Sequence, residues 1–64
     1  MDEPLQILFD ELKAQGKTWE QASEITAGLE NPWAQLDMAE WLARNRGASR
    51  QEILAEKHRL MKEQ

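Results

Sequence analysis

The stretch NPWAQLDMAEWLARNRG, residues 31–47, decides the fold of this chain. Asn31 is a preferred helix N-cap, Pro32 suits the first helical position, and Gly47 suits the residue beyond a helix end. The apolar side chains between them fall on two helical faces, namely Leu36, Ala39, Leu42 and Ala43 on one and Ala34, Met38 and Trp41 on the other. A helix that is apolar over most of its circumference is buried on most sides. The stretch therefore predicts a central helix over residues 32–46.

Three further helices are expected around it, over residues 4–15, 19–28 and 50–62. Pro4 suits the start of the first helix, and Thr18-x-x-Gln21 and Ser49-x-x-Glu52 are capping boxes that open the second and the fourth. No segment alternates between apolar and polar residues, and valine and tyrosine are absent. The sequence thus predicts a small all-α domain over residues 1–64, with four short helices packed around the third.

Some side chains can be placed on this helical frame. Trp19 shares the apolar face of the second helix, so we expect it in the core together with Trp41. Lys57 lies in the middle of the apolar stripe of the fourth helix. Its ammonium group either reaches the surface along its aliphatic stem, or that part of the stripe is open to solvent or a partner.

The composition excludes several classes of site. A chain of 64 residues lies near the lower limit for folding alone, and without cysteine it has no disulfide to stabilise it. A single histidine, His58, excludes an ordinary Cys/His zinc site. The longest apolar run, Ile7 to Phe9, is far too short to span a membrane, and the acidic first residues do not resemble a signal peptide. We therefore expect a cytoplasmic protein stabilised by helix packing or by dimerisation.

No residues are arranged for catalysis. Thr18 and Ser49 are already assigned to helix caps, and nothing places a serine beside His58. The three glycines are isolated, so there is no phosphate-binding loop. We expect a protein without enzymatic activity, metal, cofactor or small-molecule substrate.

Charge is distributed unevenly along the chain. The net charge of −4 disfavours general attraction to nucleic acid or to an anionic membrane. Residues 1–43 contain nine acidic residues and only two basic ones, whereas residues 44–64 contain six basic and three acidic residues. Either the two parts attract each other in the fold, or the C-terminal part presents a local patch that faces an anion.

Residues 39–58 partly fit a helix-turn-helix. Ala43, Gly47 and Ile53 stand at suitable spacings, and Arg50 and Gln51 would lie at the exposed start of the second helix, where such residues contact bases or phosphates. Basic residues nearby could contact the DNA backbone, namely Arg44, Arg46, Lys57 and Arg59. The favoured interpretation is an ordinary helical hairpin whose arginines complement the C-terminal dipole of the third helix, because Arg46 and Glu56 stand where the DNA-binding motif requires apolar residues.

Protein–protein interaction is the other class of function that the sequence favours. The third helix has more apolar surface than a peripheral helix needs, and Ile7 lies opposite the apolar stripe of its own helix. Trp33 is a good anchor for an interface and borders a polar stripe. We therefore predict a helical adaptor or regulatory module that binds a protein partner or a second copy of itself. Its predicted apolar interface is Trp33, Met38 and Ile7, and its predicted contacts to a partner or an anion are Arg44, Arg46, Arg50 and Gln51.

Overall fold

The computed structural model of the chain describes residues 3–63 and contains all four predicted helices. No strand occurs within this range, so the all-α prediction is confirmed. Each observed boundary lies within two residues of the predicted one, the helices being α1 Pro4–Ala14, α2 Trp19–Thr26, α3 Pro32–Arg44 and α4 Arg50–Glu63.

The helix starts are held by the predicted caps. The backbone N–H of Gln21 donates to Thr18 Oγ1 at 3.2 Å, and that of Thr18 donates to Gln21 Oε1 at 2.9 Å. The same reciprocal pair joins Ser49 and Glu52 at 3.2 and 2.9 Å. Asn31 caps α3 through its side-chain oxygen. These local bonds satisfy donors that a helix start leaves unpaired, which is why the starts were predictable from sequence.

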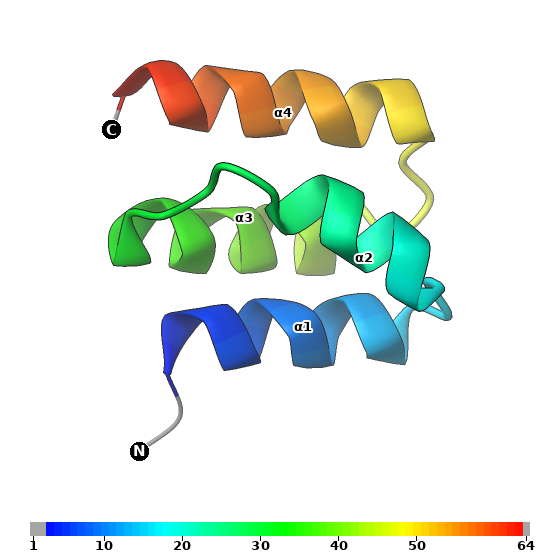
Figure 1. Cartoon of the computed structure of the whole chain (residues 1–64). Helices are drawn as coiled ribbons and strands as arrows, with labels where there is room; N and C mark the ends of the chain where they lie inside the picture. The colour runs from blue at the N-terminus through cyan, green and yellow to red at the C-terminus, as the bar shows by residue number, and fades with distance from the viewer. Residues whose placement is uncertain (1–2, 64) are drawn as a thin grey trace.

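The helices form a small bundle in which α3 lies between α1 and α4 (Figure 1). α1 and α3 run in one direction, and α2 and α4 run in the other (Figure 1). The remaining helix, α2, completes the bundle by contacting both α1 and α4. Short connections make consecutive helices run in opposite directions, but the most extensive packing joins the non-consecutive helices α1 and α3, which run in the same direction.

The core is aliphatic and draws more residues from α3 than from any other helix. Its buried apolar members are Leu8, Leu12, Ala22, Ile25, Leu29, Ala34, Met38, Ala39, Leu42, Ile53 and Leu60. Members of both predicted faces of α3 are buried, because α1 covers one flank of this helix and α4 another. The prediction of a central third helix is confirmed.

Two glutamines connect elements through hydrogen bonds that the sequence did not predict. Gln35 is buried in α3, and its amide donates to the Leu29 carbonyl at 2.7 Å. Gln15 follows α1, and its amide donates to the Leu42 carbonyl at 2.8 Å, near the end of α3. Both bonds satisfy backbone acceptors away from the regular helical ladder. They tie the ends of α3 to the preceding loop and to α1.

The tryptophans do not all lie where the sequence suggested. The prediction of a buried Trp19 is wrong, because 74% of its surface is exposed. Trp19 is the first residue of the short helix α2, and the helix reaches the core only one turn later, at Ala22 and Ile25. Trp41 is half-buried against the core, which confirms its prediction in part.

Candidate protein-interaction surface

The basic residues predicted to face a partner lie near the α3–α4 turn, but several are already paired. Arg44 forms an ion pair with Glu40 at 2.9 Å, one turn earlier on α3. Arg50 pairs with Glu24 of α2. Arg46 and Gln51 are exposed, and Arg46 forms no ion pair with any of residues 3–63. The four residues therefore do not form one free cationic site.

The Arg50–Glu24 pair joins the acidic and basic parts of the chain. Arg50 Nε and Nη2 donate to the two carboxylate oxygens of Glu24, each at 2.8 Å. This two-point hydrogen bond from Arg50 is the main cause of a lowered pKa at Glu24, and the nearby charge of Lys57 also lowers it. The pKa of Arg50 is raised by the same contact. The start of α4 is thus held against α2 instead of being free for a phosphate.

Lys57, in the middle of the apolar stripe of α4, neither reaches out to the surface nor lies in an open part of that stripe. The residue is only 8% exposed, and its ammonium group donates to the backbone carbonyl of Glu24 at 2.6 Å. That carbonyl belongs to the last turn of α2, where acceptors lack partners within the helix and a cation is favoured. Lys57 therefore caps α2 and is not available to a nucleic acid.

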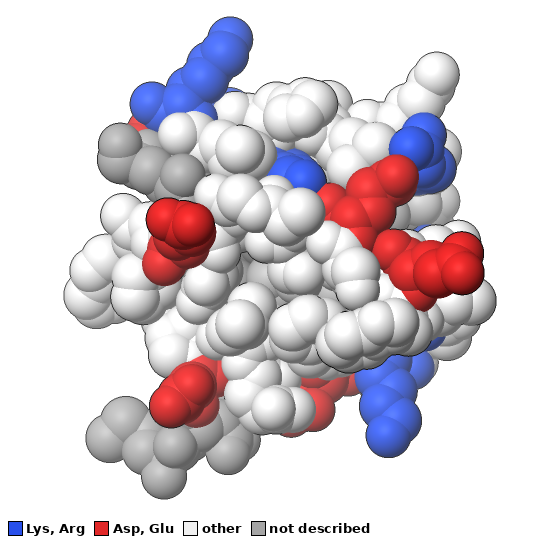
Figure 2. Space-filling model, viewed as in Figure 1, with Lys and Arg blue, Asp and Glu red and all other residues white. Residues whose placement is uncertain are grey.

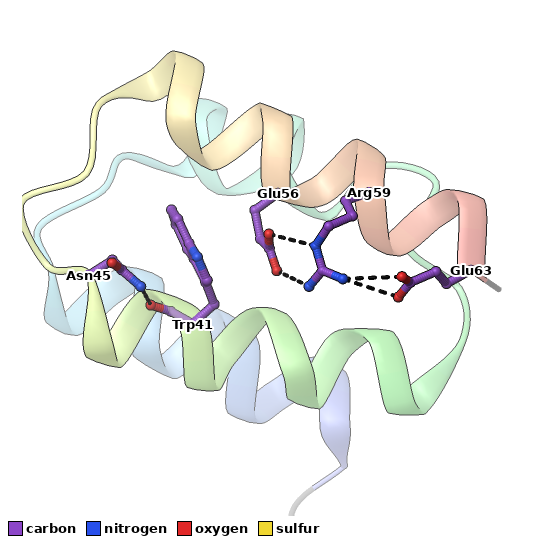
Figure 3. A network of polar contacts seen from close by, with 5 residues as sticks. All are labelled: Trp41, Asn45, Glu56, Arg59 and Glu63. Carbon is purple, nitrogen blue, oxygen red and sulfur yellow. Dashed lines mark hydrogen bonds and ion pairs between the residues drawn. The ribbon is translucent and has the colours of Figure 1, made fainter.

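Arg59 is also paired, in this case with two glutamates of its own helix, α4. Its guanidinium donates to Glu56 at 2.9 Å and to Glu63 at 3.2 Å, on the side of α4 that faces α3 (Figure 3). Hydrogen bonding to Glu56 is the main reason why the pKa of Arg59 is raised. Trp41 rises from α3 toward α4 on the same side, and its carbonyl accepts from the Asn45 amide (Figure 3). On another face, basic and acidic side chains are interspersed, and no continuous basic surface appears (Figure 2).

The arrangement of α3 and α4 also differs from that of a helix-turn-helix. In that motif the two helices cross at a large angle, so that the second can enter a DNA groove. Here α3 and α4 lie side by side and run in opposite directions (Figures 1 and 3). The geometry is that of a helical hairpin.

The predicted apolar interface does not exist as one surface. Trp33 is 75% exposed, as an interface anchor requires, and Ile7 is half-buried against the core. Met38, however, is fully buried. Its inclusion in an accessible interface was wrong, because α3 is covered on more than one side and this methionine fills space inside the bundle.

An apolar groove between α1 and α2 is the surface that sequence reasoning missed. We name it the α1–α2 groove; it has a volume of about 570 Å³ and is lined by Gln6, Phe9, Asp10, Lys13, Lys17, Thr18, Trp19 and Ala22. Trp19 and Phe9 stack within it, with ring centroids 5.5 Å apart and planes inclined by 13°. One feature of the sequence could have indicated that Trp19 is exposed, namely its position directly after the N-cap Thr18. A residue in the first turn of a helix can point away from the core face of that helix.

The charges at this groove are distinctive. Lys13 and Lys17 are the only two basic residues in positions 1–43, and both line it. Neither forms an ion pair within residues 3–63. The one carboxylate at the groove, Asp10, already accepts a hydrogen bond from Gln6 at 2.8 Å. The groove thus offers an exposed tryptophan, stacked on a partly buried phenylalanine, beside two ammonium groups that form no ion pair within residues 3–63.

The groove contains groups that can bind but no evident catalytic centre. Its polar side chains do not combine a nucleophile with a histidine base. In the part of the chain that the structure describes, no three histidine or acidic side chains lie close enough to hold a metal ion. Among the described helices, none has the length and apolar character needed to cross a membrane.

Comparison of the chain with protein-family models, with curated proteins and with solved structures finds no match.

Proposed function

We propose that the protein is a small non-enzymatic interaction module that binds another protein segment in the α1–α2 groove. The observation that supports this proposal is the exposed Trp19, which stacks on the partly buried Phe9, since large aromatic surface left to solvent typically marks a binding site. The absence of cysteine fits an adaptor or regulator in a reducing compartment such as the cytoplasm.

The chemistry of the groove indicates the kind of segment that fits. An apolar side chain would pack on Trp19 and Phe9, and neighbouring carboxylates would meet Lys13 and Lys17. The overall charge of −4 opposes such a partner only weakly, because charges more than about 8 Å apart are largely screened at physiological salt. Within the groove lining itself, two lysines stand against one aspartate, so the local charge favours an acidic partner.

A peptide titration tests the proposal. The probe is a short fluorescent peptide with one leucine flanked by glutamates, and binding is followed by fluorescence anisotropy. Two matched peptides replace the leucine by serine or the glutamates by lysines. We expect only the parent peptide to bind, and we expect added salt to weaken its binding.

Variants of the protein assign the binding to the groove. Trp19→Ala should weaken peptide binding by roughly tenfold or more, the effect of removing an interface anchor. Trp33→Ala is the matched control, because Trp33 is equally exposed but lies outside the groove. Lys13→Glu should weaken binding, whereas Lys62→Glu on the exposed side of α4 should not. Equal effects of the two tryptophan variants would contradict the proposal.

DNA binding through residues 39–58 is the competing hypothesis, and it rests on Arg46 and Gln51, which remain exposed. A duplex DNA titration across a salt series distinguishes it, because phosphate contacts make affinity fall steeply with salt. Salt-sensitive duplex binding that Arg46→Ala abolishes would favour this alternative over the groove.

A further inference from the structure

We infer that the groove accepts the Trp33 end of a second copy of this chain, so that copies assemble head to tail. This inference rests on the proposed function, because it uses the same groove, and it names one occupant. It requires a second surface on the chain with an apolar anchor and negative charge.

The start of α3 provides such a surface. Trp33 is 75% exposed at the second position of α3. A shallow hollow beside it is lined by Asn31, Trp33, Ala34, Asp37, Leu60 and Glu63. Both titratable residues in this hollow are acidic, Asp37 being unpaired within residues 3–63 and Glu63 being shared with Arg59. We call this surface the Trp33 knob.

The knob and the groove are complementary in two independent respects. Each presents one tryptophan that is about three-quarters exposed, so joining them removes both from water. Their charges are opposite, with Lys13 and Lys17 at the groove and Asp37 and Glu63 at the knob. The groove volume of about 570 Å³ lies within the size range of ligand-binding clefts.

The positions of the two surfaces determine the type of assembly. Trp19 begins α2 and Trp33 lies at the start of α3, and these two helix starts lie at opposite ends of the molecule (Figure 1). A contact between different surfaces at opposite ends is heterologous, and it continues into a chain or a ring instead of stopping at a symmetric dimer. The assembly can therefore exceed two copies.

Light scattering during gel filtration over a range of concentrations tests this inference. The full chain should rise from the monomer mass of 7.5 kDa to masses beyond a dimer as concentration increases. Trp19→Ala and Trp33→Ala should each remain monomeric at concentrations where the parent assembles. Both residues are largely exposed, so far-UV circular dichroism should show unchanged helix content.

Mixing the two variants gives the decisive result. Trp19→Ala keeps an intact knob and Trp33→Ala keeps an intact groove, so an equimolar mixture should form dimers and nothing larger. Self-association of Trp33→Ala alone would overturn the inference, because it would show a contact that does not use the knob. The same holds if the mixture stays monomeric while the parent assembles.

Charge exchange provides a second test that leaves the aromatic residues in place. Lys13→Glu and Asp37→Lys should each weaken assembly by several-fold, and the double variant should recover most of the loss, because the charges are then exchanged. Lack of recovery would count against the pairing of these surfaces. A parent chain that stays monomeric at every concentration but binds the acidic peptide would refute self-assembly and leave the proposed function standing.

Discussion

Replacing each of the three glycines by alanine separates backbone strain from packing at the helix ends. Gly16 and Gly28 have φ angles of +80° and +82°, whereas Gly47 does not lie in this region. A residue with a Cβ atom in the left-handed region costs about 1–2 kcal/mol. A Cβ at Gly16 meets no atom within 4 Å, so Gly16→Ala should lower the free energy of unfolding by that backbone cost alone.

The losses in free energy of unfolding expected for alanine at Gly28 and at Gly47 lie at or above and below the loss expected at Gly16, respectively. A Cβ at Gly28 would lie 2.9 Å from the terminal methyl of Met61, whose flexible end can move aside. Gly28→Ala should therefore cost at least as much as Gly16→Ala, and in a Met61→Ala background, whose own cost is measured separately, it should cost only as much as Gly16→Ala. Gly47→Ala meets neither obstacle, so we expect it to be neutral or to stabilise by about 0.4–1 kcal/mol by restricting the unfolded chain.

Urea unfolding followed by circular dichroism measures these differences. The comparison holds when the slope of the unfolding free energy against urea concentration is the same for each variant. A domain of 64 residues has a free energy of unfolding of roughly 3–10 kcal/mol, so a loss of 1–2 kcal/mol is readily resolved. The equivalent change in melting temperature is about 4–8 °C per kcal/mol. A Gly47→Ala variant as unstable as Gly16→Ala would refute the assignment of the cost to backbone conformation.

Two further predictions concern single hydrogen-bonded groups. Lys57→Ala should destabilise the fold by about 1.5–3 kcal/mol, because it removes a charged donor from the Glu24 carbonyl, whereas the exposed Lys62→Ala should change stability by less than about 0.5 kcal/mol in the same urea unfolding assay. Ser49→Ala should cost about 1 kcal/mol by removing the cap of α4, and Ser49→Gly only a few tenths. Equal losses for the two Ser49 variants would show that the cap is not the cause.

The helices could be predicted because their determinants are local. Thr18, Ser49 and Asn31 cap helix starts through atoms two or three residues away, and hydrophobic spacing identifies a core face within one helix. The central position of α3 was also visible, because two apolar faces on one helix require cover on more than one side.

The candidate site was not predictable to the same degree, since it depends on contacts between distant residues. Nothing local indicates that Arg50 pairs with Glu24, and this pair removes a cation from the predicted anion contacts. Periodicity likewise placed Trp19 in the core, although the residues of α2 that are buried are Ala22 and Ile25 and Trp19 remains largely exposed. Met38 was assigned to an accessible interface because it lies on the second apolar face of α3. In the fold that face is covered as well, so Met38 is buried.

Local patterns were enough to identify the helical segments, their approximate ends and the central helix, because hydrogen bonds and periodicity over a few residues carry that information. Helix packing, in contrast, sets which tryptophans remain exposed, which cations form ion pairs, and that Phe9 and Trp19 meet beside Lys13 and Lys17. The physical reason is that exposure and charge pairing depend on how helices pack on one another. Spacing along a single helix does not encode that packing.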